Sequence, residues 1–205
     1  MDLKKILDDA VSLHFTSKLP DSGSIDMLDL TGHSVRNIVN NICANDDIKY
    51  LEIGLYRGGI FSSALYQNKI RAVGIDNWSQ NWGPNDPQKV FNDRISELKK
   101  DSDIDIINSD CWAEGLLGDE KFNVYTFDGP HGWQDQYDAL CKYIENMHDI
   151  FIYIVDDYDN KKSPEVVDAV QSSIKDLKLN ILSEHTMPAG YGYHEGVYFS
   201  CLEKS

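Results

Sequence analysis

Basic residues are scarce in this 205-residue chain, which has 19 Lys and Arg against 34 Asp and Glu, a formal net charge of −15. Phosphate groups are bound by clustered Lys and Arg, so this deficit argues against nucleic acid as a partner. It argues equally against docking on an anionic membrane surface. We therefore expect neither nucleic acid nor a membrane among the partners of this protein.

Long apolar runs and paired cysteines are also missing. No stretch approaches the roughly 20 apolar residues of a membrane-spanning helix, and residues 1–15 mix acids with apolar residues and lack a cleavage-like site, unlike a signal peptide. The four cysteines lie far apart, at Cys43, Cys111, Cys141 and Cys201, with no CxxC pair. This spacing disfavours a disulfide framework and a zinc site. We expect a cytoplasmic protein with reduced thiols.

The remaining composition is that of a folded domain, with 41% hydrophobic and 11% aromatic residues. At roughly 150 residues per domain, the length predicts a single domain over residues 1–205. Its first 45 residues are expected to form a helical extension, with one helix over residues 2–15 and another after Ser34, a plausible N-cap. The oligomeric state is left open, a homo-oligomer included.

From residue 49 onward, short apolar segments alternate with helical patterns. The segments predicted as strands are Lys49–Gly54, Ile70–Asp76, Ile104–Asn108, Phe122–Asp128, Phe151–Asp156, Leu179–Ser183 and Gly196–Leu202. Helices are expected after Asp86-Pro87 and after Ser163-Pro164, because a first-turn proline favours a helix start. A third helix is expected along the apolar stripe Trp133, Tyr137, Leu140, Ile144 and Met147.

This alternation predicts an α/β fold with a doubly wound, mostly parallel seven-stranded sheet and helices on both faces. Ligands in such sheets bind at the carboxyl ends of the strands. The residues that follow each predicted strand are therefore the candidates for function.

The first predicted strand runs into a glycine loop, Gly54-Leu55-Tyr56-Arg57-Gly58-Gly59. Glycines between a strand and a helix let the main chain approach a ligand closely, although such turns are also common without function. The loop is not the dinucleotide fingerprint G-x-G-x-x-G, because Tyr56 stands at the second glycine.

Acids and aromatic residues follow the second and third predicted strands. Asp76 lies 22 residues after Gly54 and could accept hydrogen bonds from both hydroxyls of a ribose; the alternative is a helix cap or loop acid. Trp78 could cover an adenine face or belong to the core. Asp110, followed by Cys111, could accept from an adenine amino group or be a solvated loop acid.

Three carboxylates follow the fourth and fifth predicted strands, namely Asp128, Asp156 and Asp157. They would repel one another at adjacent strand ends, and a divalent cation such as Mg²⁺ would neutralise them. The alternative is that they are unpaired acids of an acidic surface. His131 lies three residues after Asp128, where it could be a catalytic base or a packed or solvated residue.

Taken together, these residues resemble the class I S-adenosylmethionine-dependent methyltransferases. Within them the chain is similar to the cation-dependent O-methyltransferases of the macrocin O-methyltransferase type, and more distantly to the catechol and caffeoyl-CoA types. The resemblance spans about residues 49–157, and its most specific segments are LEIGLYRGG, GIDNW, FDGPH and IVDDY. It implies the Rossmann-like methyltransferase fold.

The resemblance also implies roles for individual residues. The methionine part of S-adenosylmethionine would contact the loop residues Glu52, Gly54, Arg57 and Gly58, the ribose would contact Asp76, and the adenine would contact Trp78, Asp110 and Cys111. Mg²⁺ would be held by Asp128, Asp156 and Asp157 and would bind the substrate hydroxyls. The usual base of the macrocin type is replaced by Pro130, which cannot take a proton. His131 has the spacing of the catechol-type base and is our candidate.

The function predicted from the sequence is therefore Mg-dependent O-methylation of a small molecule or sugar. Two alternatives come from other classes: a catalytically silent S-adenosylmethionine-binding protein, which Pro130 favours, and a nicotinamide-dependent dehydrogenase, which Tyr56 disfavours. A sugar hydroxylase-like relative on the same scaffold is also open. The acceptor is not named by the sequence, although the segment Met187–His194 between the last two strands carries tyrosines that could reach the pocket.

Overall fold

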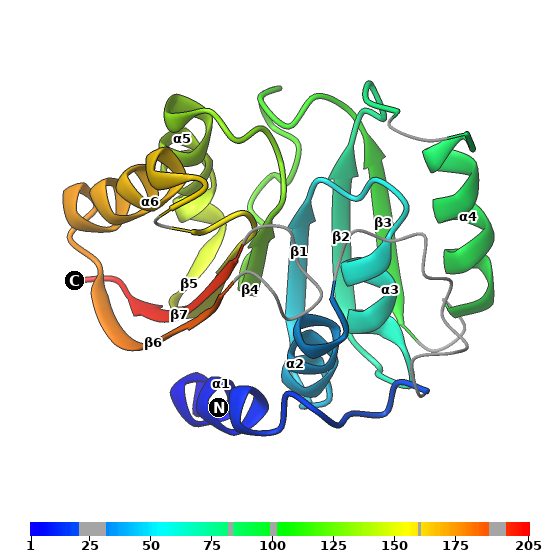
Figure 1. Ribbon diagram of the computed structural model, residues 1–205, viewed down its shortest axis with the longest axis horizontal. Helices are drawn as coiled ribbons and strands as arrows, with labels where there is room; N and C mark the ends of the chain where they lie inside the picture. The colour runs from blue at the N-terminus through cyan, green and yellow to red at the C-terminus, as the bar shows by residue number, and fades with distance from the viewer. Residues whose placement is uncertain (21–31, 82–83, 99–101, 160, 189–195) are drawn as a thin grey trace.

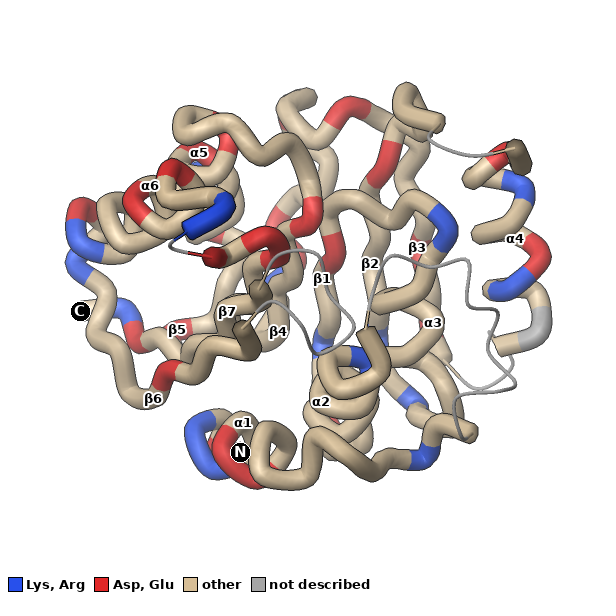
Figure 2. Tube along the Cα trace, viewed as in Figure 1, with Lys and Arg blue, Asp and Glu red and all other residues tan. Residues whose placement is uncertain are grey.

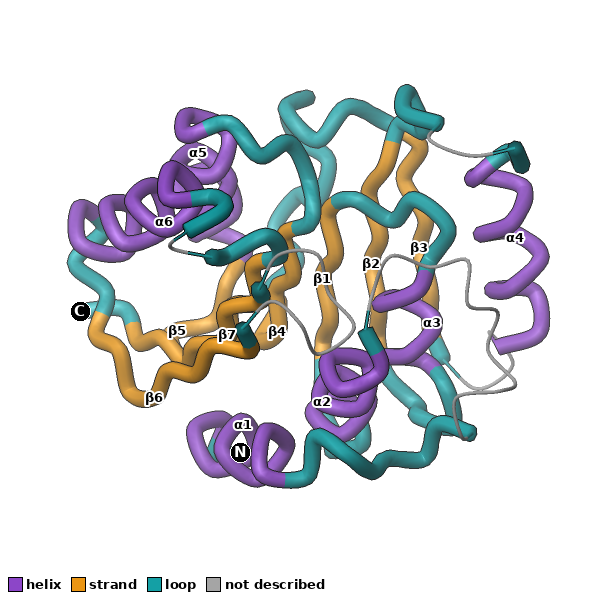
Figure 3. Tube along the Cα trace, in the orientation of Figure 1, coloured by secondary structure: helices purple, strands orange, loops and turns teal. Residues whose placement is uncertain are grey.

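Seven strands form one sheet with helices on both of its faces (Figures 1 and 3). The computed structural model describes residues 1–20, 32–81, 84–98, 102–159, 161–188 and 196–205. The strands are β1 (Lys49–Ile53), β2 (Arg71–Asp76), β3 (Asp103–Asn108), β4 (Phe122–Phe127), β5 (Met147–Val155), β6 (Asn180–Met187) and β7 (Val197–Glu203). The helices are α1 (Leu3–Ser12), α2 (His33–Cys43), α3 (Gly59–Leu65), α4 (Pro87–Leu98), α5 (Trp133–Tyr143), α6 (Pro164–Asp176) and the short 3₁₀ helix η1 (Ile144–Asn146).

The strand order is β3-β2-β1-β4-β5-β7-β6. Strands β1 to β5 pair in parallel, while β7 lies antiparallel between β5 and β6. The order reverses between β1 and β4, so the loops after these two strands leave the sheet in opposite directions and open a crevice between them. The predicted fold class, a mostly parallel doubly wound sheet of seven strands, is confirmed.

Adjacent strand residues belong to two separate cores because successive side chains point to opposite faces. Tyr50 packs in the cluster that contains residues of α1, α2, α3 and α4. The next residue, Leu51, packs in the cluster with residues of α5 and α6. Both side chains are fully buried, as expected for a sheet covered on both faces.

Helix α5 presents a different face to the core from the one that the sequence predicted. Its buried residues are Gln136, Ala139, Leu140 and Tyr143, whereas Trp133 is 38% exposed. Trp133 instead stacks on Tyr137 at the surface, with ring centroids 5.1 Å apart, and donates its indole N–H to Asp168 on α6 over 2.6 Å. The predicted stripe was wrong at these two positions because both aromatic residues face the neighbouring helix and solvent, and Gln136 is buried instead. It was also wrong at Met147, because α5 ends at Tyr143 and Met147 begins β5.

Several predicted boundaries also shift. Helix α2 begins at His33 with Gly32 as its N-cap, not at Ser34. Strands β5 and β6 are longer than predicted, and residues 109–121 connect β3 to β4 through turns, without a helix. Of the tyrosine-bearing segment after β6, residues 189–195 lie outside the described residues.

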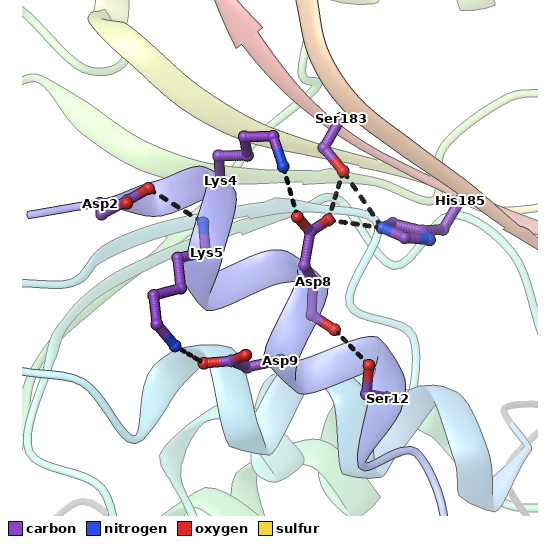
Figure 4. A network of polar contacts seen from close by, with 8 residues as sticks. All are labelled: Asp2, Lys4, Lys5, Asp8, Asp9, Ser12, Ser183 and His185. Atoms are coloured by element: carbon purple, nitrogen blue, oxygen red, sulfur yellow. Dashed lines mark hydrogen bonds and ion pairs between the residues drawn. The ribbon is translucent and has the colours of Figure 1, made fainter.

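The N-terminal helix α1 is tied to the far end of the chain by a polar network (Figure 4). The Asp8 carboxylate accepts from Lys4 over 2.6 Å, lies 2.8 Å from His185 Nε2, and accepts the Ser183 hydroxyl. Leu3 and Leu7 bury their side chains beside this network. The predicted N-terminal extension therefore packs on the same sheet that carries the rest of the fold.

Among the described residues, no helix combines the length and the apolar character that crossing a bilayer requires.

Candidate active site

A cavity of about 430 Å³ opens at the carboxyl ends of β1 to β5. Figure 2 shows several acidic positions along the loops that join the strands at this end. Almost every residue predicted from the sequence lines the cavity: Glu52, Gly54, Arg57, Asp76, Trp78, Asp110, Cys111, Asp128, His131, Asp156 and Asp157. The structure thus brings together eleven predicted residues that are spread over more than 100 residues of sequence.

The glycine loop after β1 fits tightly against its neighbours. Gly54 has φ of +87°, and a Cβ atom there would stand 1.9 Å from the main-chain oxygen of Asp128. Gly58 has φ of +78° and lies against the Phe91 ring, which a Cβ would meet at 2.6 Å. Gly58 does not itself line the cavity. Its role in this structure is to start α3 in a left-handed conformation that glycine adopts without strain.

Asp76 holds the glycine loop in place. One oxygen of its carboxylate accepts the main-chain N–H groups of Leu55 (2.7 Å) and Tyr56 (2.8 Å). The other accepts the N–H of Trp78 over 2.6 Å. Each carboxylate oxygen has more than one lone-pair direction, so the group can still accept from a ligand. The predicted ribose contact stays a prediction, and the structure adds a scaffolding role that the sequence did not indicate.

The turns after β2 and β3 share the pattern Asp-x-Trp. In the first, Asp76 accepts from the N–H of Trp78; in the second, Asp110 accepts from the N–H of Trp112 over 2.9 Å. Both tryptophans line the cavity. Trp78 is fixed further, because its indole N–H donates to the Tyr56 carbonyl over 2.9 Å and its ring packs on Phe91. Trp112 was missed by sequence reasoning, although the repeated Asp-x-Trp spacing could have indicated it.

Arg57 and Cys111 complete the part of the cavity that was expected to hold the cofactor. The Arg57 guanidinium carbon lies 5.1 Å from the centre of the Tyr56 ring, and the residue is only 5% exposed. Cys111 is half-buried, and this burial raises the pKa of its thiol to about 11. A thiol with so high a pKa is a poor nucleophile at neutral pH. Cys111 lines the cavity, and the raised pKa of its thiol gives no support for a nucleophilic role.

Glu52 is a buried acid at the floor of the cavity. It accepts the Tyr50 hydroxyl, which also lies 3.0 Å from Thr126 Oγ1. Burial raises the pKa of the Glu52 carboxyl to about 8, with smaller effects from Asp76 and Asp156. Near neutral pH this group is therefore largely protonated, and it can donate a hydrogen bond to a ligand as well as accept one.

Asp128 and Asp156 form a close carboxyl pair. Burial and the proximity of the other acids raise the pKa of Asp128, and burial also raises the pKa of Asp156 to about 7. Two carboxyls this close repel each other when both are ionised, which favours a proton on one of them when no cation is present. Asp156 Oδ1 is buried and has no hydrogen-bond partner in the described part of the chain.

Asp157 has a different partner from that pair. Its backbone φ is +56°, in the left-handed region, and its Oδ2 lies 2.9 Å from Nε2 of His131. No group of three Asp, Glu, His or Cys side chains among the described residues converges as a metal site. The three carboxylates expected to hold a metal are thus not gathered around one point, because Asp157 pairs with His131. Two carboxylates with one orphaned oxygen still suit Mg²⁺, which commonly keeps most of its waters.

Three of the six described non-glycine residues with a positive φ line the cavity. Tyr56, Trp78 and Asp157 have positive φ values of 46°, 48° and 56°, and all three line it. Non-glycine residues in this region cost roughly 1–3 kcal/mol and persist where surrounding contacts over-determine them. The Asp76 carboxylate provides such contacts, because it accepts the N–H groups of Tyr56 and Trp78. Next to Asp157, the N–H of Tyr158 donates to the Gly196 carbonyl over 2.8 Å.

The chain is similar to a known protein in sequence and to solved structures in fold. An uncharacterized protein of Acanthamoeba polyphaga mimivirus is 25% identical over 156 residues, covering 71% of this chain and 67% of that protein. No family model matches the chain. A proposed SAM-dependent methyltransferase of Streptococcus mutans superposes with a TM-score of 0.64 at 11% identity, covering 89% of this chain; this chain spans 51% of that structure.

Two further structures match over nearly their whole length. One is a proposed O-methyltransferase of Klebsiella pneumoniae, with a TM-score of 0.58 at 12% identity, covering 98% of this chain and 90% of that one. The other is a proposed RNA methyltransferase of Pyrococcus horikoshii, with a TM-score of 0.57 at 15% identity, covering 100% and 97%. The chain therefore has the Rossmann-like fold of the S-adenosylmethionine-dependent methyltransferases.

Proposed function

We propose that this protein is an S-adenosylmethionine-dependent methyltransferase that methylates a hydroxyl group of a small molecule. The observation that carries the proposal is the arrangement of one cavity at the strand ends of a methyltransferase fold. On one side lie the glycine loop, Asp76 and the two Asp-x-Trp turns, and on the other the His131–Asp157 pair. The first side suits a nucleoside, and the second suits proton transfer.

The nucleoside end of the cofactor fits the side formed by β1, β2 and β3. Asp76 would accept from the ribose hydroxyls, and Trp78 and Trp112 would bound the adenine, to which aromatic faces offer stacking. Glu52 and Arg57 would face the charged amino-acid end of the cofactor. A cavity of about 430 Å³ is within the usual range for such a ligand.

The methyl transfer itself is an in-line displacement. S-adenosylmethionine would supply the methyl group: the acceptor oxygen would bond to the methyl carbon as the carbon–sulfur bond breaks, its electron pair would stay on sulfur, and the hydroxyl proton would leave. His131 would take that proton. With Nε2–H donated to Asp157, the proton is taken by Nδ1, and the Asp157 carboxylate stabilises the imidazolium that forms.

Magnesium dependence belongs to the same proposal. Asp128 and Asp156 would hold the ion, since their adjacent carboxylates and the orphaned Asp156 oxygen call for a counter-charge. A bound Mg²⁺ would lower the proton affinity of the acceptor hydroxyl and fix its direction. Asp157 is left out of this ligand set, because it is paired with His131.

A small acceptor is favoured over RNA by charge. The chain has a net charge of −15, and the cavity is lined by six acids: Glu52, Asp76, Asp110, Asp128, Asp156 and Asp157. An RNA backbone would be repelled by the net negative charge of the chain. The RNA methyltransferase named among the similar structures shares the fold, but the acidity of the present chain argues against the same substrate.

Calorimetry and turnover test the proposal together. S-adenosylmethionine and S-adenosylhomocysteine should bind the wild type, and Asp76→Ala should weaken binding by about 1–3 kcal/mol, the cost of a charged hydrogen bond left unmade. A panel of catechols, sugars and a short RNA, assayed for S-adenosylhomocysteine, identifies the acceptor class. Binding without turnover of any acceptor would favour a catalytically silent cofactor-binding protein, which Pro130 makes the leading alternative. Preferential binding of a nicotinamide cofactor would refute the assignment.

A further inference from the structure

Gln136 is a polar residue on the otherwise apolar inner face of α5. Its relative exposure is 0%, and its neighbours on that face are Ala139, Leu140 and Tyr143. A buried amide is costly unless it is hydrogen-bonded. The Gln136 Nε2 group donates to the main-chain carbonyl of Pro130 over 3.2 Å, and the Oε1 atom has no hydrogen-bond partner within the described residues. The Gln136 amide is therefore oriented by its hydrogen bond to Pro130, in the loop after β4.

Gln136 holds this loop at two points on either side of His131. Its side chain binds the carbonyl of Pro130, and its main-chain N–H binds the carbonyl of Gly132 over 3.0 Å. Helical side chains lean toward the N-terminus of their helix, so a residue one turn into α5 reaches back to the loop that precedes it. The start of the loop is fixed separately, because Asp128 N–H donates to the Ile53 carbonyl over 2.9 Å.

Between these fixed points, His131 projects to Asp157 at 2.9 Å. The imidazole is 44% exposed, so packing alone does not set its position. A side chain that faces solvent on one side depends on its main chain for placement. The two hydrogen bonds from Gln136 to the carbonyls of Pro130 and Gly132 restrain the main chain on either side of His131.

We propose that Gln136 is a positioning residue for His131: it fixes the loop so that the imidazole stays in reach of Asp157 and of the acceptor hydroxyl. The inference rests on the proposed function, in which His131 takes the proton. Gln136 does not touch the reacting atoms, and its effect should pass entirely through His131.

Gln136→Met tests this role, because methionine fills a similar buried volume and cannot donate to Pro130. Gln134→Met is the matched control: Gln134 lies on the same helix, is exposed, and donates to Asp138 on that helix over 2.9 Å. Turnover, cofactor affinity and thermal unfolding are measured for both variants, with and without His131→Ala. Hydrogen exchange of the 129–132 main chain is followed by mass spectrometry.

We expect Gln136→Met to lower turnover on the order of tenfold, since a small misplacement of a catalytic group has such an effect. Cofactor affinity should stay within about twofold, and Gln134→Met should match the wild type. In the His131→Ala background, Gln136→Met should have no further effect on turnover, because coupled residues are not additive. Exchange at 129–132 should be faster in Gln136→Met only.

Two results would overturn the role of Gln136. One is a loss of turnover that simply multiplies with that of His131→Ala, which would mean a general effect on the fold. The other is unchanged exchange at residues 129–132. A wild type that converts no acceptor would instead refute the proposed function. If Gln136→Met fails to fold, Gln136→Leu offers the same loss of donor in a shorter side chain.

Discussion

Gly54 and the main chain of Asp128 touch so closely that the smallest possible side chain would not fit, since a Cβ atom on Gly54 would stand 1.9 Å from the Asp128 oxygen. The loop that is expected to hold the cofactor and the loop that carries His131 are thus packed backbone against backbone. Under the proposed function, this contact would set the spacing between cofactor and acceptor.

Gly54→Ala should therefore disrupt the site and destabilise the fold. The positive φ costs about 1–2 kcal/mol for a non-glycine residue, and overpacking against rigid backbone adds a further 1–3 kcal/mol or so. Gly115→Ala is the matched control, because Gly115 also has a positive φ, of 71°, with nothing within 4 Å of an added Cβ. Chemical denaturation should show a clearly larger loss for Gly54→Ala. Equal losses in the two variants would mean that the loop relaxes around the methyl group.

His131→Ala should lower turnover by about 10²–10⁴-fold, the usual contribution of a general base. Cofactor affinity should hardly change, and the acid limb of the pH–rate profile should disappear. His148→Ala, a substitution on β5 away from the cavity, controls for loss of any histidine. A fall of less than about tenfold would assign His131 to positioning and leave activation of the hydroxyl to the metal.

Chelation should abolish turnover, and added Mg²⁺ should restore it. Asp128→Asn and Asp156→Asn should each raise the Mg²⁺ concentration needed for half-maximal activity, because each removes one of two ligands. Asp157→Asn should act differently: it should lower turnover at saturating Mg²⁺, because it weakens the partner of His131. Full activity in excess chelator would exclude a metal from the mechanism.

The buried Glu52 predicts a pH-dependent stability. Its folded pKa is raised to about 8, above the unfolded value near 4.5, so the native state holds a proton that the unfolded state releases between these values. Stability from this group is present below about pH 4.5 and is lost as pH rises toward 8, at up to about 1.4 kcal/mol per pH unit. Glu52→Gln should remove this slope, so its stability relative to wild type should rise between pH 5 and 8.

Glu120→Gln provides the opposite control for that measurement. The Arg71 guanidinium lowers the pKa of Glu120, so both states carry its charge above about pH 5. The difference in stability between Glu120→Gln and the wild type should therefore not change between pH 6 and 8. A slope for Glu120→Gln, or none for Glu52→Gln, would contradict the assignment of the pH dependence to Glu52.

Asp8→Asn should loosen the attachment of α1 to β6. The Lys4 hydrogen bond, followed by those of Ser183 and His185, holds the pKa of Asp8 below its usual range. The contribution of Asp8 is therefore present above about pH 4 and is lost as pH falls below that value. Because Asp8 is partly exposed, we expect a loss of about 1 kcal/mol or less at pH 7. Asp9→Asn, which removes an exposed pair with Lys5, should cost less.

Much of the fold was predictable because the strands are short, apolar and separated by turn and cap signals. Asp86-Pro87 indicated the start of α4, and the side chain of Asp86 does accept from the N–H of Gln88 over 3.0 Å. The face of α5 was not predictable from apolar spacing alone. Trp133 and Tyr137 have the spacing of a core stripe, but their partners lie on α6 and in solvent, which only the tertiary structure decides.

The sequence predicted which residues lie at the candidate site, because they follow the strands. It did not predict which of these residues contact one another. Parallel strands bring their carboxyl ends to one edge, so Asp76, Asp128 and Asp156 could be placed together from sequence order. The direction of each carboxylate depends on local backbone. The left-handed φ of Asp157 points its side chain at His131, and no pattern in the sequence indicates that conformation.

The contact of α1 with β6 sets an order for folding during synthesis. Leu3 and Leu7 pack on a sheet whose last two strands, β6 and β7, are made about 170 residues later. Until β7 has paired between β5 and β6, part of the surface on which Leu3 and Leu7 pack does not exist. Contacts between residues so far apart in sequence form late. We therefore expect the apolar face of α1 to be only partly covered in the nascent chain, and the chain to be more prone to aggregation until both strands have been made.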